Sequence, residues 1–106
     1  MGPGGRKGLF IAFEGTEGSG KSTQARLLAD RLAARGLDVD LTREPGGTEL
    51  GERVRDILLH QRNLQDHDPR VQALLMSAAR AQHLVERVRP HLERGGIVVC
   101  DRFAAS

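Results

Sequence analysis

Aromatic residues and cysteine are scarce in this sequence, which contains no tryptophan, no tyrosine, three phenylalanines and one cysteine, Cys100. General nucleic-acid binding needs clustered basic residues with aromatic side chains between them. Here the net charge is only +2 and both signs are interspersed, so we expect no nucleic-acid partner. A lone cysteine cannot form an internal disulfide, which agrees with a reducing compartment, and we interpret Cys100 as a small buried residue of a strand.

Long hydrophobic runs are also absent, because no stretch approaches the roughly 20 apolar residues that span a bilayer. The first eight residues carry positive charge but no adequate signal-peptide core, since Glu14 follows only five apolar residues. We therefore expect a cytoplasmic protein without membrane association, with a flexible leader at 1–8 and one domain at 9–106. A chain of 106 residues can bury one core but not two.

The segment from Gly15 to Ser22 matches the phosphate-binding pattern G-x-x-x-x-G-K-[ST]. It follows an apolar run and precedes an amphipathic segment, which is the strand, loop and helix context that this motif requires. Glycines let backbone N–H groups converge on phosphate, Lys21 would reach the β- and γ-phosphates, and Ser22 would ligate Mg²⁺. The alternative is a glycine-rich turn without a ligand. The predicted ATP-binding residues are Gly15, Thr16, Glu17, Gly18, Ser19, Gly20, Lys21 and Ser22.

Hydrophobic periodicity predicts the elements on either side of this loop. Residues 9–13 form a short continuous apolar run, typical of a parallel strand buried on both faces. Residues 21–35 repeat at helical spacing, and Gly36 is placed to end that helix. Residues 37–41 alternate between apolar and polar, which predicts a strand with one exposed face or near a sheet edge.

The middle of the chain predicts a loop, a short helix and a connection. Residues 42–48 contain Pro-Gly-Gly and favour a loop. Apolar residues at helical spacing then predict a short helix that starts after Thr48. The polar segment 60–67 is expected to connect it to the next helix.

A longer helix should begin at Asp68-Pro69, an N-cap residue followed by proline at the first helical position. Pro90 should kink or end it near Arg89. A second apolar run at 97–101 predicts a strand that ends in Asp101. The residues expected to face inward from the helix are Val71, Leu74, Leu75, Ala78, Ala81, Val85 and Val88.

Strands that alternate with helices predict an α/β protein, and the loop motif indicates a P-loop NTPase-type three-layer fold with a mainly parallel sheet, truncated after the third strand. Ligands then gather at the carboxyl ends of the strands. That edge should collect 15–22, 43–48 and 101–106. Asp101 at a strand end is a weak signal alone, but together with Ser22 it favours a Mg²⁺ site.

Three arginines, Arg43, Arg80 and Arg102, could serve a second phosphorylated substrate, because such a substrate needs cations opposite the phosphate-binding loop. The alternative for each is an ordinary solvated charge. Arg102 is the strongest of the three, because it directly follows the proposed metal ligand Asp101.

Four segments together resemble the bacterial thymidylate kinases. They occur in family order and cover nearly the whole chain after the leader. The narrowest of them are the loop with Arg-Glu-Pro-Gly-Gly-Thr and the strand end with Asp-Arg-Phe. The segments read FEGTEGSGKSTQ at 13–24, TREPGGT at 42–48 followed by Gly51 and Glu52, ARAQH at 79–83 and DRF at 101–103.

The resemblance implies ATP-dependent phosphorylation of dTMP to dTDP with Mg²⁺, in an enzyme that is commonly a homodimer. Lys21 and Arg102 would be the catalytic residues, and Ser22 and Asp101 would hold the metal. Glu17 would lie near the 3′-hydroxyl of dTMP, Arg102 would bind its phosphate and Arg80 would reach the thymine edge. The acceptor pocket would also be lined by Arg43, Glu44 and Pro45.

Two departures from the family bear on these expectations. Family members usually carry an aromatic residue that stacks on thymine three or four positions before Arg80, where this chain has Ser77 and Met76. They also continue into a lid with a catalytic arginine, so we expect this N-terminal portion to be weakly active or inactive alone. The alternatives are a nucleotide-binding P-loop fragment or module without turnover, and a kinase for another nucleoside monophosphate.

Overall fold

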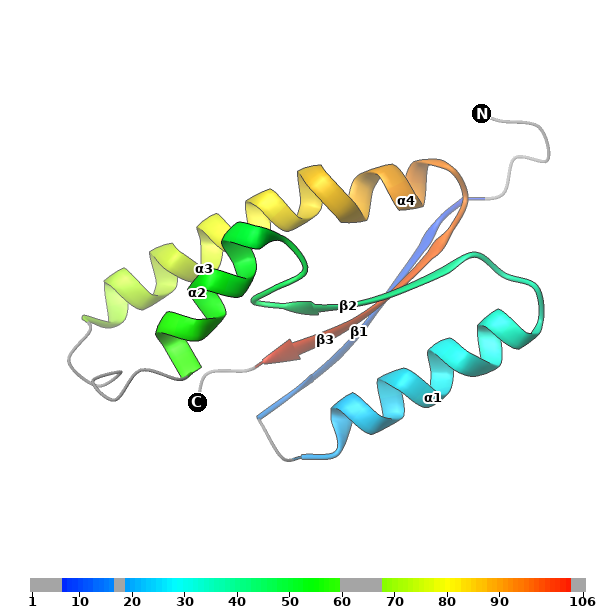
Figure 1. Ribbon diagram of the computed structural model, residues 1–106, viewed down its shortest axis with the longest axis horizontal. Helices are drawn as coiled ribbons and strands as arrows, with labels where there is room; N and C mark the ends of the chain where they lie inside the picture. Colours follow the sequence, from blue (N-terminus) through cyan, green and yellow to red (C-terminus); the bar gives the residue numbers. More distant parts are fainter. Residues whose placement is uncertain (1–6, 17–18, 60–67, 104–106) are drawn as a thin grey trace.

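The computed structural model describes residues 7–16, 19–59 and 68–103, which form three parallel strands with helices on both sides (Figure 1). Helix α1 covers one face of the sheet, and the helical segment from α3 to α4 covers the other. The predicted three-layer α/β architecture is thereby confirmed. The elements are β1 (Leu9–Gly15), α1 (Lys21–Ala34), β2 (Val39–Glu44), α2 (Glu49–Leu59), α3 (Pro69–His83), the π-helical turn η2 (Leu84–Val88), α4 (Arg89–Glu93) and β3 (Ile97–Phe103).

Strand β3 lies in the centre of the sheet, between β1 and β2. Ile97 is opposite Leu9 on one side and Val39 on the other, and both pairings are parallel. The side chains of Val98, Val99 and Cys100 are completely buried, because helices cover both faces of this strand. Cys100 is thus the buried small residue that its position in an apolar run predicted.

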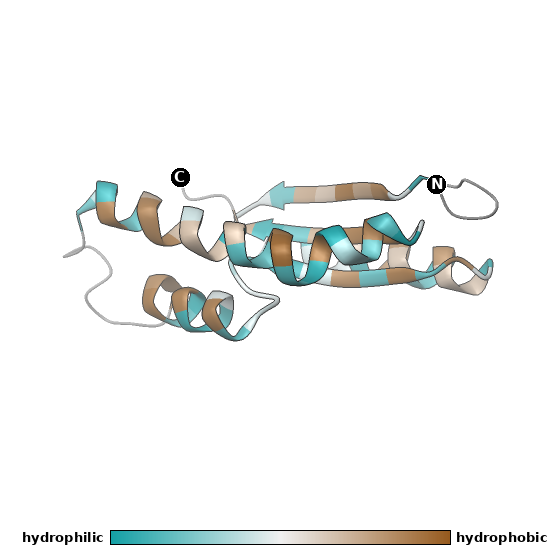
Figure 2. Cartoon of the chain, turned by 90° about the horizontal axis from the view of Figure 1, so that it is seen from above, coloured by the Kyte–Doolittle hydropathy of each residue, from teal (hydrophilic) through white to brown (hydrophobic). Residues whose placement is uncertain are grey.

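Strand β1 is more exposed than its sequence predicted. Leu9 is 53% exposed and Ala12 is also exposed, so the expectation that 9–13 is buried on both faces is wrong. The reason is position, since among the described residues β1 pairs only with β3 and lies at the sheet edge. In Figure 2, β1 is the largely hydrophobic strand that begins near the N-terminus. An apolar run therefore identified the strand but not its place in the sheet.

The two sides of the sheet are packed differently. On one side the small side chains of Ala25 and Ala29 bring α1 close to Val99. On the other side Val88 packs against Val98 and Cys100. Successive residues of a strand point to opposite faces. Val98 and Val99 can therefore each complete a separate cluster, and the small alanines keep α1 close to the sheet.

Strand β2 is longer than predicted and shifted along the chain. It spans Val39–Glu44, whereas the sequence predicted a strand at 37–41 and a loop from 42. Parallel pairing with β3 continues to Glu44, which is opposite Arg102. Pro45 follows, and its missing N–H ends the ladder. The expected edge position of this strand is confirmed.

The ends of the helices follow local sequence signals as predicted. Gly36 has φ +84° directly after α1, a conformation that glycine adopts without strain. Thr48 precedes α2, and its Oγ1 accepts a hydrogen bond of 2.9 Å from the Gly51 N–H. The Asp68 carboxylate accepts one of 2.8 Å from the Arg70 N–H at the start of α3. The predicted connection at 60–67 lies outside the described residues.

The buried face of α3 is not the one that apolar spacing predicted. Leu74 is 69% exposed and Val85 in η2 is 62% exposed, while Ala79 and His83 are buried. The inward assignment was therefore wrong for Val71, Leu74, Ala78, Ala81 and Val85, all of which are exposed. A buried polar partner on β2 turns His83 toward the sheet, and the opposite apolar stripe faces outward. Figure 2 looks onto this side of the sheet and shows hydrophobic and hydrophilic segments alternating along the helix.

Helical winding continues past Pro90 to Glu93, so this proline does not end the helix. The chain instead forms the π-helical turn η2 just before it. There the Arg89 N–H donates to the Leu84 carbonyl five residues earlier, and this wider turn precedes the residue that lacks a donor. None of the helices in the described ranges is long and apolar enough to cross a membrane.

Candidate functional site

The loop between β1 and α1 is built around two glycines. Gly20 has φ +89° and is the N-cap residue of α1. At Gly15 an added Cβ would lie 2.8 Å from Ser19 Oγ and 3.3 Å from Lys21 Cδ, so the chain folds closely over this position. The Ser19 N–H donates to the Thr16 carbonyl at 3.2 Å. Glu17 and Gly18, both predicted to bind ligands, lie outside the described residues.

The N-terminus of α1 opens onto this loop. Its N-cap is a glycine, which has no side chain to accept from the first N–H groups of the helix. Those donors and the positive end of the helix dipole favour an anion at this place. A 14-residue helix that follows a glycine-rich loop can therefore bind phosphate through its backbone.

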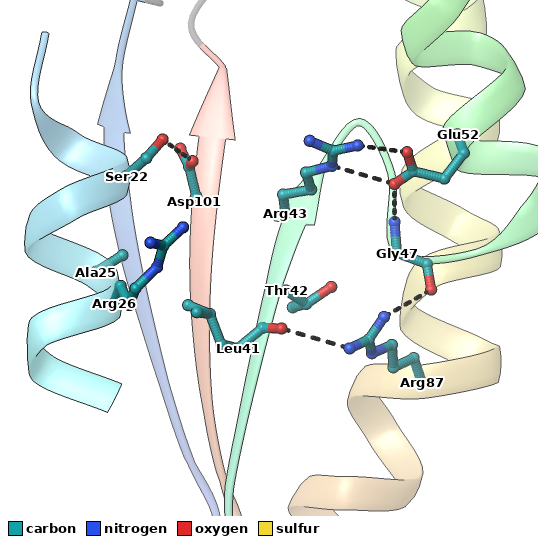
Figure 3. Close-up of a pocket in the computed structure, with 10 residues that line it drawn as sticks. All are labelled: Ser22, Ala25, Arg26, Leu41, Thr42, Arg43, Gly47, Glu52, Arg87 and Asp101. Carbon is teal, nitrogen blue, oxygen red and sulfur yellow. Dashed lines mark hydrogen bonds and ion pairs between the residues drawn. The ribbon is translucent and has the colours of Figure 1, made fainter. Parts of the chain in front are cut away.

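Asp101 at the end of β3 joins the loop to the sheet. Its Oδ1 accepts from Lys21 Nζ and its Oδ2 accepts from Ser22 Oγ at 2.5 Å, as Figure 3 shows for Ser22. Burial raises the pKa of Asp101, but the hydrogen bonds from Lys21 and Ser22 outweigh it and hold that pKa below its usual value. The structure thus brings all three predicted residues together.

A hydroxyl oxygen beside an ionised carboxylate is a donor set that suits Mg²⁺, which prefers hard oxygen ligands. Ser22 and Asp101 supply these atoms from two different elements, α1 and β3. Lys21 lies on the other oxygen of the same carboxylate, where its charge would also meet a phosphate. The residues present therefore fit the metal that the sequence predicted.

A second cluster of charges lies on the opposite face of the sheet, centred on Glu44. This residue is 2% exposed. Its Oε1 accepts from Arg80 Nε at 3.0 Å and lies 3.3 Å from Arg102 Nε, and its Oε2 is 2.8 Å from His83 Nδ1. Burial raises the pKa of Glu44, but the hydrogen bonds from His83 and Arg80 outweigh this effect. The pKa therefore lies below its usual value, and the carboxyl is ionised at neutral pH. Two of the predicted arginines therefore share one carboxylate.

Arg102 is held from several sides. Its guanidinium lies 5.2 Å from the centre of the Phe10 ring, and its Nη1 is 3.6 Å from Glu14 Oε1 at the rim. Its Nε is buried and, among the described residues, has no aligned hydrogen bond. The side chain is 27% exposed, so part of it remains open to a ligand.

Arg43 is not part of this cluster, because it points to the other face of β2. Its guanidinium donates to Glu52 at 2.6 and 3.2 Å. Together with Ser22, Arg26 and Asp101 it lines a pocket of about 350 Å³ between α1 and β2 (Figure 3). Pro45 is fully buried, and its carbonyl accepts from Arg55 Nη1 at 3.0 Å. The structure thus separates Arg43 from Arg80 and Arg102.

The contacts of Met76 and His83 are those that the sequence analysis did not predict. Met76 packs partly against the cluster of Val54, Leu58 and Ala79 between α2 and α3. His83 is completely buried and links Glu44 to Thr42 Oγ1, which is 2.8 Å from its Nε2. The sequence analysis gave His83 no role. A histidine three residues after Arg80 on the same helix was the only available signal.

The ligand atoms of Glu44, His83 and Cys100 lie within 4.8 Å of one another. Both ring nitrogens of His83 already have oxygen partners. Burial, with a smaller contribution from Glu44, raises the pKa of Cys100 to about 12, so the thiol keeps its proton. This cluster is therefore a polar part of the core and lacks the free donors that a metal needs.

The glycine-rich loop at a helix N-terminus, the strand-end carboxylate and the parallel sheet define an α/β protein of the P-loop class. The sequence profile of the thymidylate kinases matches residues 13–106, so the chain belongs to the thymidylate kinase family.

Relatives and a solved structure agree with this assignment. A thymidylate kinase of Pseudomonas fluorescens (strain SBW25) is 56% identical over 99 residues, which cover 93% of this chain and 47% of that protein. One of Roseiflexus sp. (strain RS-1) is 57% identical over 92% of this chain and 43% of that protein. The crystal structure of thymidylate kinase from Ehrlichia chaffeensis matches with a TM-score of 0.80 and 44% identity, over 92% of this chain and 54% of that one. The chain spans about half the length of these relatives.

Proposed function

We propose that this chain forms the N-terminal part of a kinase that transfers the γ-phosphoryl group of ATP to dTMP, giving ADP and dTDP. One observation carries the proposal. At the carboxyl end of β3, Asp101 joins the phosphate-binding loop on one face, and Arg102 joins a second cationic cluster on the other. Phosphoryl transfer needs two phosphate sites beside each other, and little more than alignment and charge neutralisation.

The donor side uses the loop and the start of α1. Backbone N–H groups between Gly15 and Ser22 would hold the ATP phosphates, and Lys21 would exchange its contact with Asp101 for the β- and γ-phosphate oxygens. Lys21 would be catalytic, because its charge is placed where negative charge must be neutralised. Ser22 and Asp101 would hold Mg²⁺, which when bound neutralises charge on the β- and γ-phosphates.

The acceptor side uses the arginines bound to Glu44. Arg102 would bind the dTMP phosphate and act as the second catalytic residue, and Arg80 would reach the thymine edge. Two guanidinium groups share the buried carboxylate of Glu44, and the only other acidic group paired with either of them among the described residues is the exposed Glu14, which a phosphate monoester could displace from Arg102. We also assign Glu17 to the sugar 3′-hydroxyl and a lining role to Arg43, with Glu44 and Pro45, both buried, directly behind the pocket surface.

We also propose that the protein forms a homodimer through the outer face of α3. The exposed residues Val71, Leu74, Ala78, Ala81 and Val85 follow the three and four residue spacing of a coiled-coil seam. Leu74 and Val85 are more than half exposed, which is costly for an isolated chain in water. Association of two such faces would bury them. The cytoplasmic location expected from the sequence remains a prediction.

Equilibrium binding of dTMP and of ATP with Mg²⁺ to this chain tests the two phosphate sites, with Lys21→Ala and Arg102→Ala as variants. We expect Lys21→Ala to lose ATP binding selectively and Arg102→Ala to lose dTMP binding selectively. A loss that does not follow this pattern, or no binding by the wild-type chain, would overturn the proposal. Binding of both ligands that still gives no dTDP when the C-terminal half of a thymidylate kinase is supplied would support a nucleotide-binding module without turnover instead.

A further inference from the structure

Glu44 occupies an unusual place for a residue of a binding site, because it is buried while both of its arginine partners reach the surface. Its side chain is 3% exposed, whereas that of Arg80 is 47% exposed and that of Arg102 is 27% exposed. A nucleotide at the surface would touch the arginines before it touched this carboxylate. Glu44 therefore acts on a ligand through the arginines.

The contacts of Glu44 are made with the inner end of each arginine. Arg80 donates a hydrogen bond to Oε1 from Nε at 3.0 Å, and Arg102 forms an ion pair with the same oxygen, its Nε 3.3 Å away. A contact at Nε restricts the side-chain torsions and does not use the terminal NH₂ groups, of which one, Arg102 Nη1, lies 3.6 Å from the exposed Glu14 carboxylate. The two arginines come from α3 and β3, so this one oxygen joins the elements that we assign to the base and to the phosphate of dTMP.

His83 fixes the carboxylate itself. A carboxylate only accepts, so His83 Nδ1 must carry the proton in its 2.8 Å contact with Glu44 Oε2. The other ring nitrogen is 2.8 Å from Thr42 Oγ1, two residues before Glu44 on the same face of β2. An imidazole bound at both nitrogens cannot rotate, and the surrounding core leaves it no exposed surface.

We propose that Glu44 and His83 are positioning residues that hold Arg80 and Arg102 in the arrangement needed to bind a nucleoside monophosphate. This inference rests on the proposed function, because it names how that acceptor site is preorganised. Preorganised arginines lose less side-chain freedom when the ligand binds, which raises affinity without a further contact.

The variant Glu44→Gln tests this proposal, because the two possible roles of Glu44 predict opposite changes in dTMP affinity. If Glu44 were only a nearby negative charge, its removal would strengthen binding of an anionic ligand. If it positions the arginines, its removal weakens dTMP binding, by about tenfold for the loss of a charge-assisted contact. ATP affinity should stay unchanged, because the phosphate-binding loop lies on the other face.

Asp40→Asn is the matched control for this variant. Asp40 lies on the same face of β2 and forms a comparable pair with Arg87, at 2.8 Å, but it contacts neither Arg80 nor Arg102. We expect it to keep the wild-type dTMP affinity. A similar loss in both variants would mean that Glu44 acts only through general stability, and would overturn the inference.

The role of His83 is tested by two substitutions. The side-chain amide of His83→Asn can donate from nearly the position of Nδ1, so it should keep most of the dTMP affinity. His83→Leu fills the space without a donor and should lose affinity several-fold. Equal affinities for the two variants would show that His83 does not position Glu44.

Circular dichroism and thermal unfolding of each variant establish that it folds. If Glu44→Gln does not fold, Thr42→Val and Thr42→Ser carry the test from the far end of the network, with weaker dTMP binding expected only for Thr42→Val. Failure of the wild-type chain to bind dTMP would overturn the proposed function and this inference with it. Wild-type binding that weakens in Arg102→Ala but is unchanged or tighter in Glu44→Gln would overturn this inference alone.

Discussion

Asp101 and Arg102 follow each other on β3, yet their side chains act on opposite faces of the sheet. Asp101 reaches Lys21 and Ser22 on α1, and Arg102 reaches Glu44 on β2. Because successive side chains of a strand point to opposite faces, two adjacent residues contribute to two separate charged sites. Movement of the end of β3 would change both sites together.

Loss of the Lys21 charge should affect one ligand only. We expect Lys21→Ala to weaken binding of ATP with Mg²⁺ by about 10- to 100-fold, the usual range for a charge-assisted hydrogen bond. Binding of dTMP should be unchanged. Titration calorimetry with each ligand measures this, with Arg31→Ala on the exposed end of α1 as the control. An equal loss of both ligands would show that Lys21 supports the fold.

The stability of the fold should fall in acid. The pKa values of Asp40 and Glu44 are lowered in the folded chain, that of Asp40 chiefly by its hydrogen bond from Arg87. Groups with a lowered folded pKa stabilise the fold above their unfolded pKa, about 4, and this stabilisation is lost as the pH falls through that value toward the folded pKa.

Urea unfolding between pH 7 and pH 3 measures this effect. Asp40→Asn should lower the midpoint at pH 7 and flatten its dependence on pH. Asp30→Asn, an exposed position on α1, should change neither. A wild-type midpoint that stays constant down to pH 3 would contradict the expectation.

Alanine variants at three glycines can distinguish a loss of stability through backbone strain from a loss of ligand binding. Gly20 and Gly36 both have positive φ with open space around them, so alanine at either should cost about 1 kcal/mol of stability. Only Gly20→Ala should also weaken ATP binding, because Gly36 lies at the far end of α1. Gly15→Ala should weaken ATP binding by displacing Ser19 and Lys21. Thermal unfolding and nucleotide titration of the three variants together give this comparison.

The outer face of α3 should control association. We expect Leu74→Glu to shift the chain from dimer to monomer in sedimentation experiments, because a charge in the seam would be buried without a partner. Leu27→Glu is the matched control, since Leu27 is 56% exposed on α1, away from that face. A wild-type chain that is monomeric at every concentration would rule out this interface.

Selectivity for the base should be weak. Met76 packs between α2 and α3, and Ser77 provides no ring, so stacking would contribute little to thymine recognition. We expect dUMP, which lacks one methyl group, to bind within about tenfold of dTMP. A panel of nucleoside monophosphates measures this, and a hundredfold preference for dTMP would require a contact that the described residues do not supply.

Local signals in the sequence predicted much of the fold. The glycine-rich loop, the small residues of α1, Thr48 before α2 and Asp68 before α3 each act within a few residues, and the structure confirms the elements that they start or end. The same holds for Asp101, whose position at a strand end could be predicted from the apolar run before it.

The remaining features depend on contacts between distant residues. His83 faces inward because it binds Glu44. The two residues are 39 positions apart in the sequence, so the spacing of apolar residues within α3 could not reveal this contact and predicted the wrong face. The length of β2 depends on pairing with β3, and no pattern within 37–48 reveals that. The shared carboxylate of Arg80 and Arg102 could not be predicted for the same reason.

The π-helical turn η2 changes the phase of the long helix. Without it, Val88 would continue the exposed series that ends at Val85, three positions earlier. The wide turn uses an additional residue, and Val88 instead lies 1% exposed against the sheet. The exposed apolar series therefore ends at Val85, and the helix that follows packs against the sheet. Deletion of a single residue within Leu84–Val88 would restore ordinary winding and leave both faces as they are, because the wide turn absorbs one additional residue.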